Sequence, residues 1–180
     1  MIRLFTAIRI PQAQKECLLA TMGGLPQVRW QREDQLHLTL RFIGEVDEEK
    51  TEEIRLILST IQFLPFSVRI KGVDIFGPAR KPRMLWAGLE NPAPVKALQE
   101  KITNTLRRLE LEPEDRKYKP HVTLARIKGN NGDKLAQFLE HYATLALDPF
   151  AANEFVLFKS HLSHTGAQYQ VIETYPAGMV

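Results

Sequence analysis

The sequence predicts an α+β fold of two pseudo-symmetric lobes, each a mainly antiparallel sheet with helices outside and a cleft between the lobes. Three observations lead to this prediction. The tetrapeptide His-x-Thr-Leu occurs twice, at 37–40 and at 121–124. Segments with strand and helix periodicity follow one another in the same order in both halves. No long linker separates the halves, so we expect a single domain over residues 1–180, an internal duplication with approximate halves 1–80 and 81–180.

The first half contains the patterns of three strands and two helices. The expected elements are a strand at Arg3–Ile8, a helix from about Pro11, a strand at Leu36–Ile43, a helix capped by Asp47 and a strand at Phe66–Phe76. Proline is typical of the first turn of a helix, and aspartate is a common N-cap. The first helix is expected to bury Cys17 and Leu18. A single cysteine has no partner for an internal disulfide, so we expect Cys17 to be a small core residue.

The second half repeats this order. The expected elements are a strand at Arg83–Leu89, a helix beginning at Pro92 or Pro94, a strand at Pro120–Ile127, a helix capped by Asp133 and a strand at roughly Phe150–Lys159. The first of these helices has an apolar stripe at helical spacing. Its members are Val95, Leu98, Ile102, Leu106 and Leu109. A last strand is expected at Gln168–Tyr175.

Composition limits the class of protein. The chain is 44% hydrophobic and 25% charged, as in ordinary globular proteins. No apolar run approaches a membrane span and no leader resembles a secretion signal, so we expect a cytoplasmic protein without membrane association. The net charge of +3 tolerates a polyanionic ligand without requiring one. Residues 116–128 hold basic but no acidic side chains; this run is either a solvated face or a contact with phosphate, and the sequence leaves both open.

The repeated tetrapeptide supplies groups for acid–base chemistry on a phosphate. Residues two apart on a strand share a face, so His37 points with Thr39 and His121 with Thr123. If the two strands meet, two imidazoles and two hydroxyls converge. An imidazole can accept or donate a proton near neutral pH, and opening a cyclic phosphodiester requires one group for each task. We expect both threonine hydroxyls to bind phosphate.

Other kinds of site have less support. The metal-binding spacings H-E-x-x-H and C-x-x-C are absent, as are the G-x-S-x-G nucleophile elbow and the Walker loop, so we expect neither metal nor cofactor. Arg126 lies an odd number of positions after His121, which places it on the opposite face of a straight strand. Its participation requires a twist, a bulge or an edge position. Of the aromatic residues, Phe42 is a candidate for stacking on a base.

These motifs resemble the 2H phosphoesterase superfamily, and within it the RNA 2′,3′-cyclic phosphodiesterases, also called 2′–5′ RNA ligases. The similarity covers nearly the whole chain, including the opening strand, the runs 37–46 and 120–126, and the closing segment 158–169. The resemblance implies a bilobal fold with its active site between the lobes and no metal. It also implies that His37 is the proton donor and His121 the proton acceptor, and that Thr39, Thr123 and Arg126 contact the phosphate.

The resemblance predicts an enzyme that hydrolyses RNA 2′,3′-cyclic phosphate ends to 2′-phosphomonoesters. Its partners would be RNA with such ends or small cyclic nucleotides. We expect a monomer that requires no protein partner. Two alternatives stay open from the sequence: ATP-independent 2′–5′ ligation of RNA ends at the same site, and a non-catalytic RNA-binding module.

Overall fold

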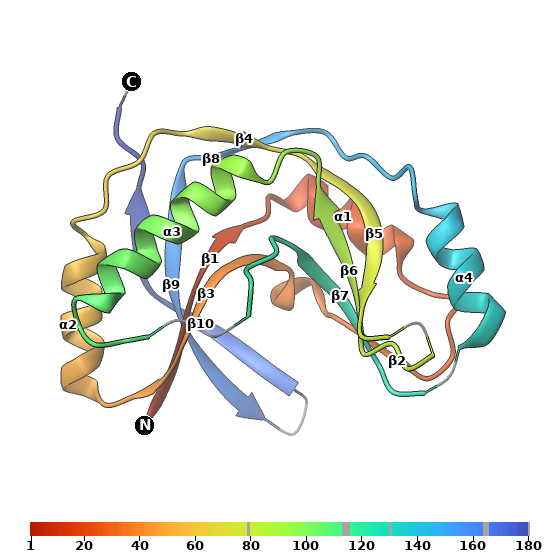
Figure 1. Cartoon of the computed structure of the whole chain (residues 1–180), viewed down its shortest axis with the longest axis horizontal. Helices are drawn as coiled ribbons and strands as arrows, with labels where there is room; N and C mark the ends of the chain where they lie inside the picture. Colours follow the sequence, from red (N-terminus) through yellow and green to blue (C-terminus); the bar gives the residue numbers. More distant parts are fainter. Residues whose placement is uncertain (79, 113–115, 130, 164–165, 180) are drawn as a thin grey trace.

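The computed structural model describes residues 1–78, 80–112, 116–129, 131–163 and 166–179 (Figure 1). The elements, in chain order, are β1 (Ile2–Arg9), α1 (Gln12–Thr21), β2 (Val28–Trp30), the 3₁₀ helix η1 (Glu33–Gln35), β3 (His37–Val46), α2 (Glu48–Leu58), β4 (Phe66–Val68), β5 (Ile70–Phe76), β6 (Met84–Leu89), α3 (Ala93–Arg107), β7 (Val122–Ile127), α4 (Gly132–His141), β8 (Phe150–Ala152), β9 (Glu154–Ser163) and β10 (Gly166–Pro176). None of the helices in the described ranges is long and apolar enough to cross a membrane.

One eight-stranded sheet runs through the molecule. Its order is β10-β9-β1-β3-β7-β6-β5, with β2 pairing on β7 away from this path. Each pairing in it is antiparallel, as is the separate pair formed by β4 and β8. The predicted α+β class with mainly antiparallel sheet is therefore confirmed.

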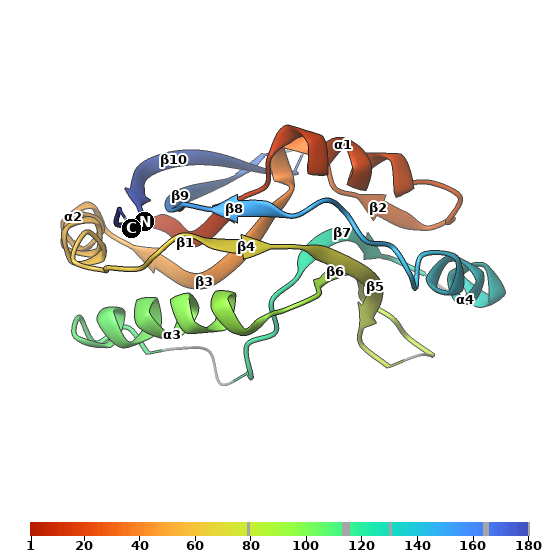
Figure 2. The same cartoon turned by 90° about the horizontal axis from the view of Figure 1, so that it is seen from above.

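Two lobes meet where β3 pairs with β7. Lobe one contains β1, β3, β9 and β10 with α2 and α3, and lobe two contains β2, β5, β6 and β7 with α1 and α4 (Figure 1). One strand near the end of each half crosses to the other lobe: β5 pairs with β6, and β9, which is followed by β10, pairs with β1. The two crossing segments run side by side as β4 and β8 (Figure 2).

This exchange means that the lobes do not coincide with the halves 1–80 and 81–180. Helices α1 and α3 also exchange, and Figure 2 shows them on opposite sides of the molecule, α3 toward the end that holds α2 and α1 toward the end that holds α4. The internal duplication of the chain stays a prediction. The repeated element order and the reciprocal exchange of β5 and β9 both support it.

The core contains most of the predicted apolar positions. The buried residues of α3 include four members of its predicted stripe: Val95, Leu98, Ile102 and Leu106. The prediction for α1 is wrong in part: Leu18 is buried, but Cys17 is exposed. The buried face of α1 consists of Gln14, Leu18 and Thr21, which are spaced at one helical turn, and Cys17 lies off that face.

Local sequence patterns predicted one helix cap correctly, but they missed a second cap and two breaks in the predicted strands. Asp47 caps α2 as predicted, with its side chain accepting a hydrogen bond from the Lys50 amide at 2.8 Å. The prediction that Asp133 caps α4 is wrong, because the helix begins at Gly132. The strands predicted at 66–76 and 150–159 are each interrupted, at Arg69 and Asn153. The short elements β2 and η1 were not predicted, because three residues are too few to show a period.

The junction between β3 and β7 should be sensitive to core truncation. Leu38 is 1% exposed and is the β3 residue that pairs with β7. We expect Leu38→Ala to lower the free energy of unfolding by about 2–5 kcal/mol, since it leaves a cavity between the lobes. Urea denaturation followed by circular dichroism measures this. The control Leu56→Ala, at a side chain 60% exposed, should change stability by less than about 0.5 kcal/mol. Equal effects from both variants would contradict this role for the junction.

Candidate active site

The two His-x-Thr motifs lie side by side where the lobes meet. Strands β3 and β7 are antiparallel, and Leu38 pairs with Val122. Continuing this register places His37 beside Thr123 and Thr39 beside His121. Leu38 and Val122 are buried, whereas the four polar side chains are half-buried on the other face. The two strands are therefore related by an approximate two-fold axis through the Leu38–Val122 pair, and this register directs the two imidazoles and the two hydroxyls to one face of the sheet.

A β-bulge in β3 changes which residues share this face. Successive residues of β1 pair with Thr39 and Arg41, so Leu40 is an extra residue in β3. Leu40 and Arg41 are both buried, which shows that the alternation is reset at this point. Phe42 therefore returns to the face of His37 and Thr39. Its side chain is 55% exposed there.

Strand β7 has a bulge at the matching position. Successive residues of β6 pair with Thr123 and Ala125, so Leu124 is the extra residue. Leu124 and Ala125 are both buried, and Arg126 is exposed on the face of His121. From the sequence, Arg126 could reach the site only through a bulge, a twist or an edge position, and the structure supplies a bulge. Phe42 and Arg126 consequently occupy equivalent places in the two motifs.

His37 lies among aromatic rings. The Phe5 ring is 5.0 Å from its imidazole, the Phe158 ring 6.4 Å, and the Tyr169 ring approaches edge-on at 5.1 Å. Burial among these rings lowers the pKa of His37 to about 4, which the hydrogen bond to the Gln35 backbone opposes. The charge of His121 lowers the same pKa further, which indicates that the two imidazoles are within electrostatic reach.

His121 has a similar but less enclosed setting. Its Nδ1 is 2.7 Å from the Lys119 carbonyl oxygen, so Nδ1–H donates in the neutral form and Nε2 keeps a free lone pair. The Phe76 ring lies edge-on at 4.8 Å and the Trp86 ring at 6.0 Å. Burial lowers the pKa of His121, and the nearby charge of Lys119 lowers it further, against the effect of the backbone hydrogen bond.

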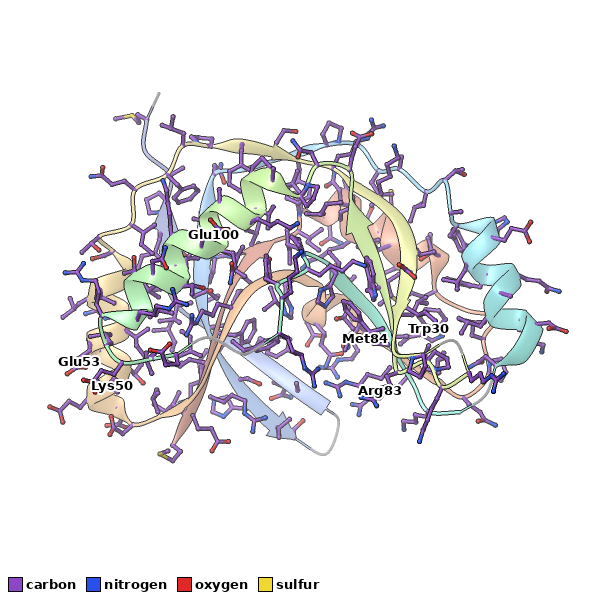
Figure 3. All side chains as sticks on the ribbon, in the orientation of Figure 1. Trp30, Lys50, Glu53, Arg83, Met84 and Glu100 are labelled. Atoms are coloured by element: carbon purple, nitrogen blue, oxygen red, sulfur yellow. The ribbon has the colours of Figure 1, made fainter. Side chains whose placement is uncertain are left out.

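The threonines and Arg126 surround the imidazoles. The Thr123 hydroxyl lies 3.4 Å from the sulfur of Met84, which is labelled in Figure 3 on lobe two. The Thr39 carbonyl accepts a hydrogen bond from Tyr118 at 2.8 Å, which anchors β3. Arg126 has no ion pair in the part of the chain that the structure describes. Burial raises the pKa of Tyr169 on β10, and the positive charge of Arg126 partly opposes this rise, so the two side chains are within electrostatic reach of each other.

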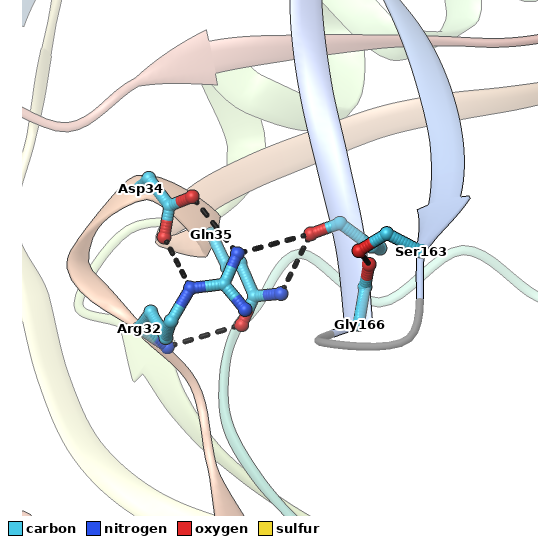
Figure 4. Close-up of polar contacts among 6 residues, drawn as sticks. Arg32, Asp34, Gln35, Ser163 and Gly166 are labelled. Carbon is cyan, nitrogen blue, oxygen red and sulfur yellow. Dashed lines mark hydrogen bonds and ion pairs between the residues drawn. The ribbon is translucent and has the colours of Figure 1, made fainter.

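Tyr169 is a site residue that the sequence patterns did not reveal. It contacts His37 from β10, a strand far from both motifs in sequence. The segment before β3 is tied to the same strand: Gln35 donates a hydrogen bond to the Ala167 carbonyl at 2.8 Å and accepts one from the Arg32 amide at 3.1 Å (Figure 4). No local pattern signals these contacts, because they depend on where β10 pairs. Among the described residues, no three His, Cys, Asp or Glu side chains form a potential metal site.

Comparison with known proteins identifies the family. The model for the LigT like Phosphoesterase family matches residues 8–86 and 89–169. The chain belongs to this family. The predicted 2H phosphoesterase resemblance is therefore confirmed.

Relatives of this LigT-like phosphoesterase cover nearly its full length. A Methanocaldococcus jannaschii protein named RNA 2′,3′-cyclic phosphodiesterase is 35% identical over 178 residues, with 96% of this chain and 99% of the relative covered. A Thermotoga maritima protein of the same name is 34% identical over 145 residues, covering 79% and 76%. A crystal structure from Thermus thermophilus has a TM-score of 0.80 at 25% identity, covering 97% of each chain. E. coli LigT in complex with 3′-AMP has the same fold, with a TM-score of 0.81 at 23% identity and 99% of each chain covered.

The burial of the two histidines predicts their titration. In the free protein we expect His37 to titrate at about 4 and His121 below 6.5, followed by NMR of the imidazole resonances. Phe158→Ala should raise the pKa of His37, because water then reaches the ring. His37 binds a proton more weakly in the folded than in the unfolded chain. Its contribution to stability is therefore complete above pH 6.5 and decreases as the pH falls toward 4. A measured His37 pKa at or above 6.5 would contradict the conclusion that the surrounding aromatic rings shield this imidazole from water.

Proposed function

We propose that this LigT-like phosphoesterase is an RNA 2′,3′-cyclic phosphodiesterase that leaves a 2′-phosphomonoester. The observation that carries the proposal is the pairing of β3 with β7, which brings two imidazoles and two threonine hydroxyls onto one face. The names of its relatives support the reaction class, since proteins 34–35% identical to it are named RNA 2′,3′-cyclic phosphodiesterase.

In the proposed reaction, a water molecule attacks the phosphorus of the cyclic phosphate. His121 accepts the proton of that water at Nε2, which is free because Nδ1–H donates to the Lys119 carbonyl. The bond between phosphorus and the 3′ oxygen breaks, and His37 donates a proton to that oxygen. The phosphate stays on the 2′ oxygen. The 84-residue separation of the motifs in sequence is immaterial here, because β3 and β7 are adjacent in the sheet.

The different burial of the two histidines supports these roles. A group with a lower pKa is the stronger acid when protonated, and His37, with its pKa of about 4, is the more strongly shifted. His121 is less enclosed and the better base of the two. A bound phosphate anion raises the pKa of a neighbouring imidazole, so substrate binding favours the protonated His37 that the step requires.

Thr39, Thr123 and Arg126 are proposed to hold the phosphate. The two hydroxyls lie beside the two imidazoles, and the Arg126 fork matches the non-bridging oxygens, where charge builds in the transition state. Phe42, exposed at the place equivalent to Arg126 in the other motif, is proposed to stack on the terminal base. The site therefore offers an apolar surface on one side and a cationic one on the other.

Several expectations stay predictions. These are the absence of a metal or cofactor, the monomeric state and the cytoplasmic location. Two alternative functions also stay open. The first is the joining of RNA ends through a 2′–5′ linkage, which is the reverse of a related transesterification at the same site. The second is a non-catalytic RNA-binding module, which would keep the fold without turnover. An assay that identifies products from cyclic-ended RNA distinguishes all three functions.

Removing either imidazole should abolish most turnover. We expect His37→Ala and His121→Ala each to lower kcat at least ~100-fold, the lower range for loss of a positioned acid or base. The wild-type pH–rate profile should be bell-shaped, because one imidazole must be charged and the other neutral. His141→Ala, at an exposed histidine ending α4, is the matched control. Near-normal activity in either active-site variant would refute the assignment.

Arg126 should matter more than a nearby basic residue. We expect Arg126→Ala to raise KM and lower kcat at least ~10-fold, because it removes a charge-assisted contact with phosphate. Lys128→Ala, at an exposed residue just after β7, should have a much smaller effect. Arg126→Lys should restore activity only in part, since an ammonium lacks the planar fork. Steady-state kinetics on a cyclic nucleotide measures the activity of all three variants. Equal losses of activity in Arg126→Ala and Lys128→Ala would mean that Arg126 acts only through the overall positive potential of the basic segment.

The polarity of bond cleavage is the most specific prediction. In-line attack requires water to enter opposite the leaving oxygen, so the cyclic phosphate must bind in one orientation between the histidines. With His37 as donor, we expect the 2′-phosphate product. Phosphorus NMR of the product from a cyclic mononucleotide decides this. A predominantly 3′-phosphate product would mean that the two histidines have the opposite roles, which the approximate two-fold axis permits geometrically.

A further inference from the structure

Each of the two site histidines lies against a stacked pair of aromatic rings. In lobe one the pair is Phe5 and Phe158, with ring centroids 5.2 Å apart. In lobe two it is Trp86 and Phe76, with ring centroids 5.0 Å apart. The first pair comes from β1 and β9 and the second from β6 and β5, which are the neighbouring strands on each side of the junction. The aromatic surroundings of the two imidazoles therefore follow the approximate two-fold symmetry.

A different third group covers each pair. Tyr169 approaches Phe5 edge-on at 5.0 Å. The ammonium of Lys119 lies over Trp86, 4.3 Å from the ring centroid, and 5.9 Å from the centroid of Phe76. An ammonium over the face of an indole is attracted to the ring. The symmetry thus ends with a neutral phenol in lobe one and a cation in lobe two.

These contacts hold the ammonium close to His121. The Trp86 ring that it covers is 6.0 Å from the imidazole, so the ammonium is no farther than about 10 Å from it, which is the Debye length at 0.1 M salt. The backbone of Lys119 is closer still, because its carbonyl oxygen is 2.7 Å from Nδ1. Burial is the main cause that lowers the pKa of His121, and the charge of Lys119 lowers it further.

Asp74 on β5 is the acidic group next to Lys119. Its carboxylate is 3.9 Å from the ammonium, and both side chains are 56% exposed. Water screens an ion pair that is this long and this exposed. Asp74 therefore weakens the field of Lys119 at His121 without cancelling it.

The remaining charges near the imidazoles act on His37 or on the substrate. Burial is the main cause of the low pKa of His37, and the charges of His121 and of Lys15 on α1 lower it further. Arg126 lies on the same face and binds phosphate in the proposed function. The proposed reaction needs one proton, on His37. A cation that acts mainly on His121 favours this arrangement, whereas a cation that acts on His37 opposes it.

We propose that Lys119 is a positioning residue whose ammonium, held over Trp86, disfavours a proton on His121 and so directs the proton shared by the two imidazoles to His37. This inference rests on the proposed function and deepens it. It names the group that keeps the proposed base unprotonated while the proposed acid is charged. Lys119 acts through His121 and not on the substrate.

The direct test is the titration of the His121 imidazole by NMR in the free protein. Lys119→Met keeps an unbranched apolar side chain on Trp86 and removes the charge. We expect it to raise the pKa of His121 by about 0.3–1 unit at low salt, as for one unit charge at this distance. Lys119→Arg keeps the charge and can stack on the indole, so it should keep the wild-type pKa. At about 1 M salt most of the difference between Lys119→Met and wild type should disappear.

Two further variants check the sign and the position of the charge. Asp74→Asn removes the opposing carboxylate and should lower the pKa of His121 below its wild-type value. Lys117→Met makes the same substitution at an exposed lysine two residues earlier in the same segment. It is the matched control and should leave the pKa of His121 unchanged.

The pH dependence of turnover gives an independent readout. Among enzyme molecules that hold one proton on the two imidazoles, only those with the proton on His37 react. A higher proton affinity at His121 therefore lowers the maximum of kcat/KM and moves the high-pH limb to higher pH. For Lys119→Met we expect a maximum about twofold to tenfold lower, a limb shifted by the same factor, and an unchanged kcat/KM at pH values above the limb. A merely structural role would lower kcat/KM equally at every pH.

An unchanged pKa of His121 in Lys119→Met would overturn the inference, as would a loss of kcat/KM that is equal at every pH. If Lys119→Met does not fold, an Asp74→Asn variant with the wild-type pKa of His121 overturns it. A wild-type protein that opens no cyclic phosphate would instead overturn the proposed function, and this inference with it. An active protein whose His121 pKa does not respond to Lys119→Met overturns this inference alone.

Discussion

The pairing of Leu38 with Val122 is the contact on which the rest of the structure depends. It joins two lobes into one continuous sheet and fixes the register of β3 against β7. Because side chains alternate along a strand, this register buries the two apolar partners on one face and directs two imidazoles and two hydroxyls to the other. A slip of β7 by one residue would turn His121 and Thr123 to the opposite face, away from His37 and Thr39. The buried leucine and valine thus position the polar site.

The two bulges extend this arrangement beyond the paired residues. An extra residue at Leu40 and another at Leu124 reset the alternation at matching places. Each bulge returns one more side chain to the site face, and the two side chains differ: phenylalanine at 42 and arginine at 126. An approximately two-fold backbone therefore carries a chemically asymmetric site. A cyclic nucleotide is asymmetric as well, with an apolar base and an anionic phosphate.

Two strands break the approximate symmetry, and both border the site. Strand β10 follows β9 in lobe one and brings Tyr169 to His37. Strand β2 pairs on β7 in lobe two and brings Arg29 beside Arg126. The segment after β2 is tied to β10 through Gln35 and Arg32, so these two additions contact each other across the junction. The repeated elements supply the acid–base pair, and the two added strands supply the surroundings that distinguish one histidine from the other.

The sequence by itself determined the features that local periodicity records. The repeated tetrapeptide was enough to predict that His37 and Thr39 share a face, and the spacing of Val95, Leu98, Ile102 and Leu106 was enough to predict the buried side of α3. Tertiary structure decided the rest. The exposure of Cys17 depends on which side of α1 meets the sheet, and the place of Arg126 depends on a bulge that is defined only against β6. The exchange of β5 and β9 between lobes and the approach of Tyr169 and Arg29 depend on pairing between residues far apart in the chain. A local pattern reports which face of an element is apolar, whereas the partner and register of that element are set by packing over the whole molecule.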